Sequence, residues 1–262
     1  MSLYRFFILI VFLQFYCIPS FAEEDANSNP LLANSWILPS WKKACIDTDT
    51  YNPNGTFTTV SGEQVTEGTY SISKKLPSGF YRLTTKTLKD SGGTDCYDSS
   101  KDDTGRILTS FIKFISPGEY IFCSEEKLNK CIGYYRTPDK TVVFPEESLP
   151  ECTDEMTREF AKRVNASYKE KVVYPHEVRL YKREWQGILG ALEDAITGRL
   201  LGLEIIQTTG NKSLDQAMID AVNSATYPTP ICKPITGIRY YVSHFNFMPP
   251  PQKDNPPVDA KQ

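Results

Sequence analysis

The chain has 262 residues, which is enough for two domains with cores of their own. Its 29 basic and 32 acidic residues nearly balance, and the formal net charge of −3 argues against nucleic acid or an anionic membrane surface as a partner. The 15 tyrosines and 14 phenylalanines favour β-rich modules.

The first residues have the pattern of a targeting segment. Arg5 precedes the apolar run FFILIVFLQFYCI, and Ser20-Phe21-Ala22 forms a small-x-small cleavage site. We therefore expect residues 1–22 to be a secretory signal peptide and the protein to be periplasmic. The alternative is an uncleaved anchor that holds the chain in the inner membrane, facing the periplasm.

The cysteines indicate disulfide bonds. There are seven, and Cys17 lies inside the predicted signal peptide. The six that remain are an even number in a secreted chain, which favours disulfides over metal sites or a catalytic thiol. We expect Cys152 to pair with Cys232 and the other four to pair among themselves in one of three connectivities; these four are Cys45, Cys96, Cys123 and Cys131.

Residues 35–136 consist of short strand patterns separated by turn signals such as Asn54-Gly55 and Pro117-Gly118. Many short strands at even spacing predict an antiparallel β-sandwich or a small β-barrel. The strands are expected at 56–60, 68–72, 80–84, 107–115, 120–123 and 131–136.

This β-rich part resembles small lipocalin-like domains, because Trp36 near its start is followed by a run of hairpins and the strand GTYSI. The resemblance implies a cup that holds a small apolar ligand. Asn34 stands where the lipocalin pattern has a glycine, which puts closure of the barrel and any ligand cavity in doubt. The alternative is a disulfide-pinned module that binds protein or spaces the second domain.

Residues 140–173 are predicted to form a helical connector. Thr153 is suited to cap the helix, and Asp154 and Glu155 place carboxylates in its first turn, where they suit the helix dipole. The stripe that would pack on one of the domains comprises Phe160, Ala161, Val164 and Tyr168. After the second domain, the Pro-rich residues 248–262 are predicted to form an extended, flexible tail.

Residues 174–247 have the signals of a ββαβ unit. The segment QGILGALEDAITGRLLGLEIIQ predicts two strands joined by a turn at Thr197-Gly198, SLDQAMIDAVNSA predicts a helix, and GIRYYVSHFNF predicts a last strand. Ser213 with Gln216 suggests a capping box. The apolar stripe of the helix comprises Leu214, Ala217, Met218, Ala221 and Val222. The whole chain is therefore expected to be α+β, with an antiparallel barrel or sandwich followed by this unit.

The second unit resembles the C-terminal domain of the TonB family, the energy transducers of Gram-negative envelopes. The resemblance is carried, in order, by Tyr174-Pro175, Gln186-Gly187-Ile188, Gly198, the run from Thr209-Gly210 through Ser213-Leu214-Asp215-Gln216-Ala217, and Tyr227-Pro228. It implies binding to an outer-membrane transporter or another envelope protein, with a partner strand added to an exposed sheet edge. The partner-binding residues that it implies are Tyr174, Pro175, Arg239, Tyr240, Tyr241, Val242 and Phe245, within a last strand that spans 237–247.

Two departures separate the chain from that family. A TonB transducer keeps its N-terminal membrane helix and carries a long Pro-rich spacer before the domain, whereas here the first segment has a cleavage site and a β-rich domain takes the spacer's place. A soluble periplasmic binding module is therefore the first expectation. An energy transducer is the alternative if residues 1–22 stay in the membrane, and a ligand carrier built on the β-rich domain is a further one.

The sequence carries no enzyme signature, and we expect no cofactor and no metal site. It has no Gly-x-Ser-x-Gly elbow, phosphate-binding glycine loop or His-Glu-x-x-His motif. His176 and His244 are expected to be ordinary strand or loop residues, so a hydrolase is the least favoured reading. The acidic pair Glu193-Asp194 precedes a turn and is expected to be solvated.

Overall fold

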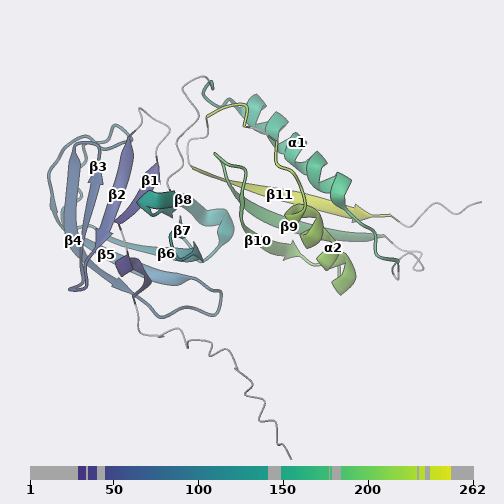
Figure 1. Ribbon diagram of the computed structural model, residues 1–262, viewed down its shortest axis with the longest axis horizontal. Coiled ribbons are helices and arrows are strands. Elements are labelled where there is room, and N and C mark those ends of the chain that lie inside the picture. The colour runs from purple at the N-terminus through teal and green to yellow at the C-terminus, as the bar shows by residue number, and fades with distance from the viewer. Residues whose placement is uncertain are drawn as a thin grey trace, which may run out of the picture.

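The computed structural model describes residues 29–33, 35–39, 45–140, 149–176, 178, 184–228, 230–233 and 237–248. The predicted signal peptide and the tail beyond Met248 lie outside the described residues. The described chain has a closed eight-stranded antiparallel barrel followed by a three-stranded sheet with two helices, so the protein is α+β with a barrel (Figure 1).

The barrel is built in simple up-and-down order, and each strand pairs with the next. Its strands are β1 (Ser35–Pro39), β2 (Ile46–Tyr51), β3 (Thr56–Ser61), β4 (Gln64–Ile72), β5 (Tyr81–Asp90), β6 (Ile107–Ser116), β7 (Glu119–Cys123) and β8 (Cys131–Arg136). A pairing of Ile37 in β1 with Arg136 in β8 closes the ring. The barrel, and not the sandwich, is therefore the architecture present, despite the departure at Asn34.

Aromatic and aliphatic side chains fill one end of the barrel. Trp36 is fully buried and contacts Tyr120 and Phe114 edge to face, with ring centroids 4.7 and 5.8 Å apart. Its indole nitrogen donates a hydrogen bond to the Leu31 carbonyl at 3.0 Å, which ties the short 3₁₀ turn at Pro30–Ala33 to the barrel. Aromatic side chains bury large areas, so Trp36, Phe114 and Tyr120, the aromatic plug, stabilise this end of the barrel.

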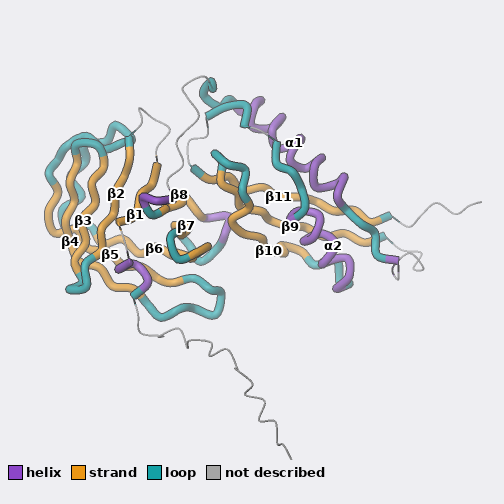
Figure 2. The backbone as a smooth tube through the Cα atoms, in the orientation of Figure 1, coloured by secondary structure: helices purple, strands orange, loops and turns teal. Residues whose placement is uncertain are grey.

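The second unit is an antiparallel sheet of order β10-β9-β11, comprising β9 (Trp185–Asp194), β10 (Leu200–Gln207) and β11 (Ile238–Phe247). The helices α1 (Asp154–Lys171) and α2 (Lys212–Asn223) pack on one face of it (Figure 2). Every residue of the predicted α2 stripe is buried there, together with Phe160, Val164 and Tyr168 of α1. The turn between β9 and β10 has Gly198 at φ +70°, a conformation that glycine adopts readily.

The caps of the helices agree with the sequence in one case and not in the other. Thr153 caps α1, and its hydroxyl accepts a hydrogen bond from the Met156 amide at 3.2 Å, as expected. The predicted Ser213 cap is wrong. Helix α2 begins at Lys212, and the side chain of Asn211 accepts from the amides of Ser213 and Leu214. Asparagine caps as well as serine does, so the upstream residue takes the role.

Three disulfides tie the fold together: Cys45–Cys96, Cys123–Cys131 and Cys152–Cys232. The pairing of Cys152 with Cys232 is the one that the sequence favoured, and it links the segment before α1 to the segment before β11. The other two bonds lie within the barrel domain and select one of the three connectivities left open. Disulfides of this number indicate an oxidising compartment outside the cytoplasm. None of the helices in the described part of the chain is long and apolar enough to span a membrane.

Candidate functional sites: a sheet edge and a barrel cavity

The first candidate site is the outer edge of β11. This strand pairs with β9 in an unbroken register over ten residues, from Ile238 opposite Asp194 to Phe247 opposite Trp185. In the described part of the chain no other strand pairs with β11, so its second row of backbone groups forms a sheet edge. An edge of this kind is a template for a further strand.

Most β11 side chains that the TonB resemblance assigns to this site contact the helices or β10, and do not face solvent at the sheet edge. Tyr241 and Phe245 are buried against the helices. Tyr240 donates a hydrogen bond to Glu204 of β10 at 2.5 Å, and the guanidinium of Arg239 lies 4.5 Å from the centre of the Phe160 ring. Val242 is 42% exposed. Partner contacts at β11 would therefore come from its backbone, Val242 and the exposed neighbours His244 and Asn246.

The structure brings Tyr174 and Pro175 to the far end of this strand. The Tyr174 ring packs edge to face on Phe247 with centroids 5.7 Å apart. Pro175 lines a groove between the end of α1 and the start of α2, together with Lys171, Val173, Lys212 and Gln216. These two residues thus join the same end of the sheet as the last residues of β11, although the sequence separates them by about seventy positions.

The acidic pair Glu193-Asp194 is not solvated, and that expectation is wrong. Both residues are buried, at 1% and 2% exposure, Asp194 against the barrel and Glu193 beside Tyr241 and Arg239 of β11. Asp194 accepts a hydrogen bond from Arg136 of β8 at 2.6 Å, and Tyr241 donates to Glu193 at 3.2 Å. Burial raises the pKa of Glu193 to about 7, although the Arg239 charge opposes that rise.

A shared apolar core next to the Arg136–Asp194 ion pair joins the two units. Ile121, Leu128 and Tyr134 of the barrel domain pack with Leu192 of β9 and Ile238 of β11. Nearby, Arg199 donates to Glu119 of β7 at 2.7 Å. The barrel and the sheet therefore meet through buried contacts and not through a loose tether.

The second candidate site is a cavity of about 240 Å³ inside the barrel, at the end opposite the aromatic plug. The alternation of β2 turns Asp47, Asp49 and Tyr51 inward, and their partners across the ladder on β3 are Ser61, Thr59 and Phe57. Thr59 donates a hydrogen bond to Asp49 at 2.7 Å. Hydroxyls and carboxylates line the cavity together with apolar and aromatic side chains such as Phe57, Leu83 and Phe122.

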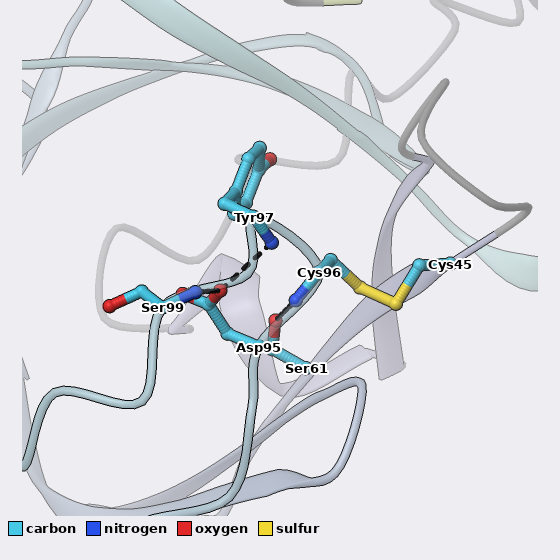
Figure 3. Close-up of a disulfide and its surroundings, with 6 residues drawn as sticks. All are labelled: Cys45, Ser61, Asp95, Cys96, Tyr97 and Ser99. Atoms are coloured by element: carbon cyan, nitrogen blue, oxygen red, sulfur yellow. Dashed lines mark hydrogen bonds between the residues drawn. A yellow bond between two sulfur atoms is a disulfide. The ribbon is translucent and has the colours of Figure 1, made fainter.

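A loop between β5 and β6 forms one wall of this cavity at its mouth. The disulfide Cys45–Cys96 fastens the loop beside the start of β2, and the Cys96 amide donates to the Ser61 hydroxyl at 3.0 Å (Figure 3). Within the loop, Asp95 accepts from the amides of Tyr97 and Ser99 at 2.8 and 2.7 Å (Figure 3). This fixed loop adds Asp95, Tyr97, Asp103 and Arg106 to the cavity lining.

Burial controls the electrostatics of the cavity. It raises the pKa of Asp49 to about 6 and outweighs the hydrogen bond from Thr59, with the neighbouring Asp47 adding to the rise. Burial also raises the pKa of Asp47, and it raises the pKa of Tyr97 to about 12. The sequence analysis missed these residues. The available signal was the period-two run Asp47-Thr48-Asp49-Thr50-Tyr51, which fits a strand with polar residues on one face.

The two histidines that the sequence analysis considered do not form a catalytic pair with each other. His176 and His244 are both exposed. Within the described residues there is no group of three or more His, Cys, Asp or Glu side chains placed to hold a metal ion.

Comparison with known proteins gives little further guidance. No known family profile matches the chain, and no solved structure matches it. An alignment of 168 positions that covers 60% of this chain is 24% identical to DNA polymerase IV from Shewanella frigidimarina (strain NCIMB 400). The chain spans 45% of that polymerase's length. An identity of this size over part of both proteins shows no common family.

Proposed function

We propose that the protein is a periplasmic binding module that takes an extended segment of an envelope protein along β11. One observation carries the proposal: β11 is a ten-residue edge strand whose inner row is fully paired with β9 and whose inward side chains are anchored under α1 and α2. Such a strand is rigid before binding, so a partner strand would gain backbone hydrogen bonds with little ordering of this chain.

The order of elements supports the resemblance to the C-terminal domain of TonB. Strands β9 and β10, helix α2 and strand β11 follow one another as the sequence predicted, and β11 lies at one side of the sheet. We therefore take outer-membrane transporters, or other envelope proteins with extended periplasmic segments, as the partner class. The proposed role is binding and not catalysis.

Hydrogen exchange tests the proposal directly. Synthetic extended peptides from the periplasm-facing segments of outer-membrane transporters would be added to the oxidised protein. We expect a bound peptide to slow exchange along β11 and not along β10. If the whole set leaves β11 unprotected, or if protection appears on β10 instead, this assignment of the edge is overturned.

A pair of proline variants supplies the matched control. Val242 on β11 and Ile206 on β10 are exposed apolar residues on the two edge strands, at 42% and 50% exposure. Val242→Pro should abolish peptide binding and Ile206→Pro should retain it, with circular dichroism checking both folds. Should either proline variant unfold, Val242→Asp and Ile206→Asp make the same comparison without removing a backbone donor.

The apolar run in residues 1–22 supports a second reading, in which partner binding serves energy transduction. That reading needs these residues to remain as an inner-membrane anchor. Intact mass of the protein from fractionated cell envelopes separates the two. A chain that begins at Glu23 in the periplasmic fraction supports a soluble module, and a chain that keeps residues 1–22 in the inner membrane supports a transducer.

A further inference from the structure

We propose that the barrel cavity is a binding site for a small organic cation, a protonated aliphatic amine, held between Asp47 and Asp49. The cavity lies inside the barrel and uses none of the residues of the β11 edge, so this inference stands independently of the proposed partner binding.

The first support is the burial of two carboxylates next to each other. Asp47 and Asp49 are two positions apart on β2, so both side chains project from the same face of the strand into the barrel. They are 6% and 7% exposed. Burying a carboxylate is costly unless a charge or several donors compensate it, and two carboxylates on one face repel each other as well.

The second support is that the described surroundings offer these carboxylates no positive charge and leave one of their oxygens without a donor. The donors to both carboxylates are neutral hydroxyls: Thr59 at 2.7 Å, Tyr51 at 3.5 Å and Tyr135 for Asp49, and Ser61 and Tyr97 for Asp47. The Oδ1 atom of Asp47 is buried and has no hydrogen-bond partner among the described residues. Buried polar atoms in folded proteins are nearly always paired, so an unpaired oxygen that faces a cavity indicates a missing donor.

The third support is the charge balance of the lining. Among the described residues that line the cavity, four are carboxylates and one is basic. The basic residue is Arg106, and its guanidinium lies 2.6 Å from the Asp103 carboxylate at the mouth. The protein's own cation is therefore committed elsewhere, and a positively charged ligand would supply the charge that Asp47 and Asp49 lack.

An organic amine fits the cavity better than a metal ion does. The described residues offer no group of three metal-binding side chains, whereas calcium takes six or more oxygen ligands. Aromatic side chains form part of the wall, where they suit an alkyl stem and the face of an ammonium group; they are Tyr51, Phe57, Phe122 and Tyr135. A volume of about 240 Å³ lies below the usual range for drug-sized ligands, so the amine is small.

The test is calorimetric titration of the oxidised full chain with butylamine, 1,4-diaminobutane and phenethylamine, with 1-butanol as the neutral probe. At least one amine should bind and the alcohol should not. Asp47→Asn and Asp49→Asn should each weaken that binding about tenfold or more, because a charged hydrogen bond is lost. The control is Glu67→Gln, a carboxylate on the outside of the same barrel that faces Lys89, which should leave amine binding unchanged.

Three outcomes would overturn the inference. The first is that none of the amines binds better than the alcohol. The second is that binding is insensitive to both asparagine variants while Trp fluorescence shows them folded. The third is that calcium or magnesium chloride binds at the same residues more tightly than any amine, which would assign a metal site instead.

Discussion

The guanidinium of Arg136 on β8 donates to the carboxylate of Asp194 on β9 across 2.6 Å, and both side chains are almost completely buried. Replacing Arg136 by Met should cost about 3–5 kcal/mol of unfolding free energy, because it leaves a buried carboxylate without its counter-charge. Urea unfolding measures the loss.

A double variant separates the charge from the packing around it. Arg136→Met with Asp194→Leu removes both charges, so it should be more stable than Arg136→Met alone. If the single and double variants lose the same amount of stability, the loss in Arg136→Met does not come from the unpaired Asp194 carboxylate.

The buried Asp49 should make the unliganded protein less stable as pH rises. Its folded pKa of about 6 exceeds its ordinary value of 3.8, so the folded state holds a proton that the unfolded state has released between these values. Linkage then predicts a loss of up to about 3 kcal/mol as pH rises through this window. Asp49→Asn should remove the loss, and the variant should gain stability over the wild type at pH 7.5 but not near pH 4. An equal gain at both pH values would contradict this assignment.

Amine binding should depend on the same carboxylates and weaken as pH falls through about 6, where Asp49 takes up its proton. The other ionisable groups around this pair are Tyr51 on β2, Tyr120 and Tyr135 on β7 and β8, and Asp95, Tyr97, Asp103 and Arg106 on the mouth loop. Titration of the amine at pH 5, 6 and 7.5 measures the effect. An affinity that does not change over this range would show that Asp49 stays ionised or does not touch the ligand.

The disulfides should differ in their contribution to stability. Cys152–Cys232 closes a sequence separation of 80 residues and Cys123–Cys131 one of 8. In the chain-entropy account, the longer loop is worth about 4 kcal/mol and the shorter one about 2 to 3. Serine replacement of each pair, followed by denaturant unfolding, should therefore show the larger loss for Cys152 and Cys232. Equal losses for the two pairs would mean that the disulfides act on the folded state and not through the entropy of the unfolded chain.

Gly68 on β4 should not tolerate a side chain. A Cβ at this position would lie 2.1 Å from the backbone carbonyl oxygen of Lys86 on β5, beside a bulge in the ladder. Gly68→Ala should lower the free energy of unfolding by at least about 1–3 kcal/mol, because the backbone of β4 or β5 has to move. Gly237→Ala is the control, because a Cβ there meets nothing within 4 Å. Thermal melts of the two variants make the comparison.

Sequence analysis predicted the barrel strands β3 to β8 and the elements that pack in the helix–sheet core. The α1 and α2 stripes and the Thr197-Gly198 turn follow from periodicity and turn chemistry, which are local properties. The barrel's first two strands were missed. In β2 the inward positions are Asp47 and Asp49, so the usual rule of apolar inside and polar outside is inverted and the strand looks like a loop.

The candidate site residues were less predictable because burial depends on distant segments. Glu193 and Asp194 precede a turn, and local chemistry suggests that water surrounds them. In the fold, Arg136 of the barrel binds Asp194, and Tyr241 of β11 donates to the buried Glu193. Tyr241 and Phe245 lie on the strand that the resemblance identified, but strand alternation turns them under the helices. A resemblance can indicate an edge strand, whereas only the packed structure shows which of its side chains face outward.

The β1–β8 pairing that closes the barrel, its seam, couples the unfolding of the barrel to that of the sheet. Arg136 pairs with Ile37 to close the ring between β8 and β1, and the same residue holds Asp194 of the neighbouring sheet. Opening the seam and separating the two units are therefore a single event. We expect differential scanning calorimetry to show one cooperative unfolding transition for the whole molecule. No partly unfolded intermediate should be populated in which the barrel is folded and the sheet is not.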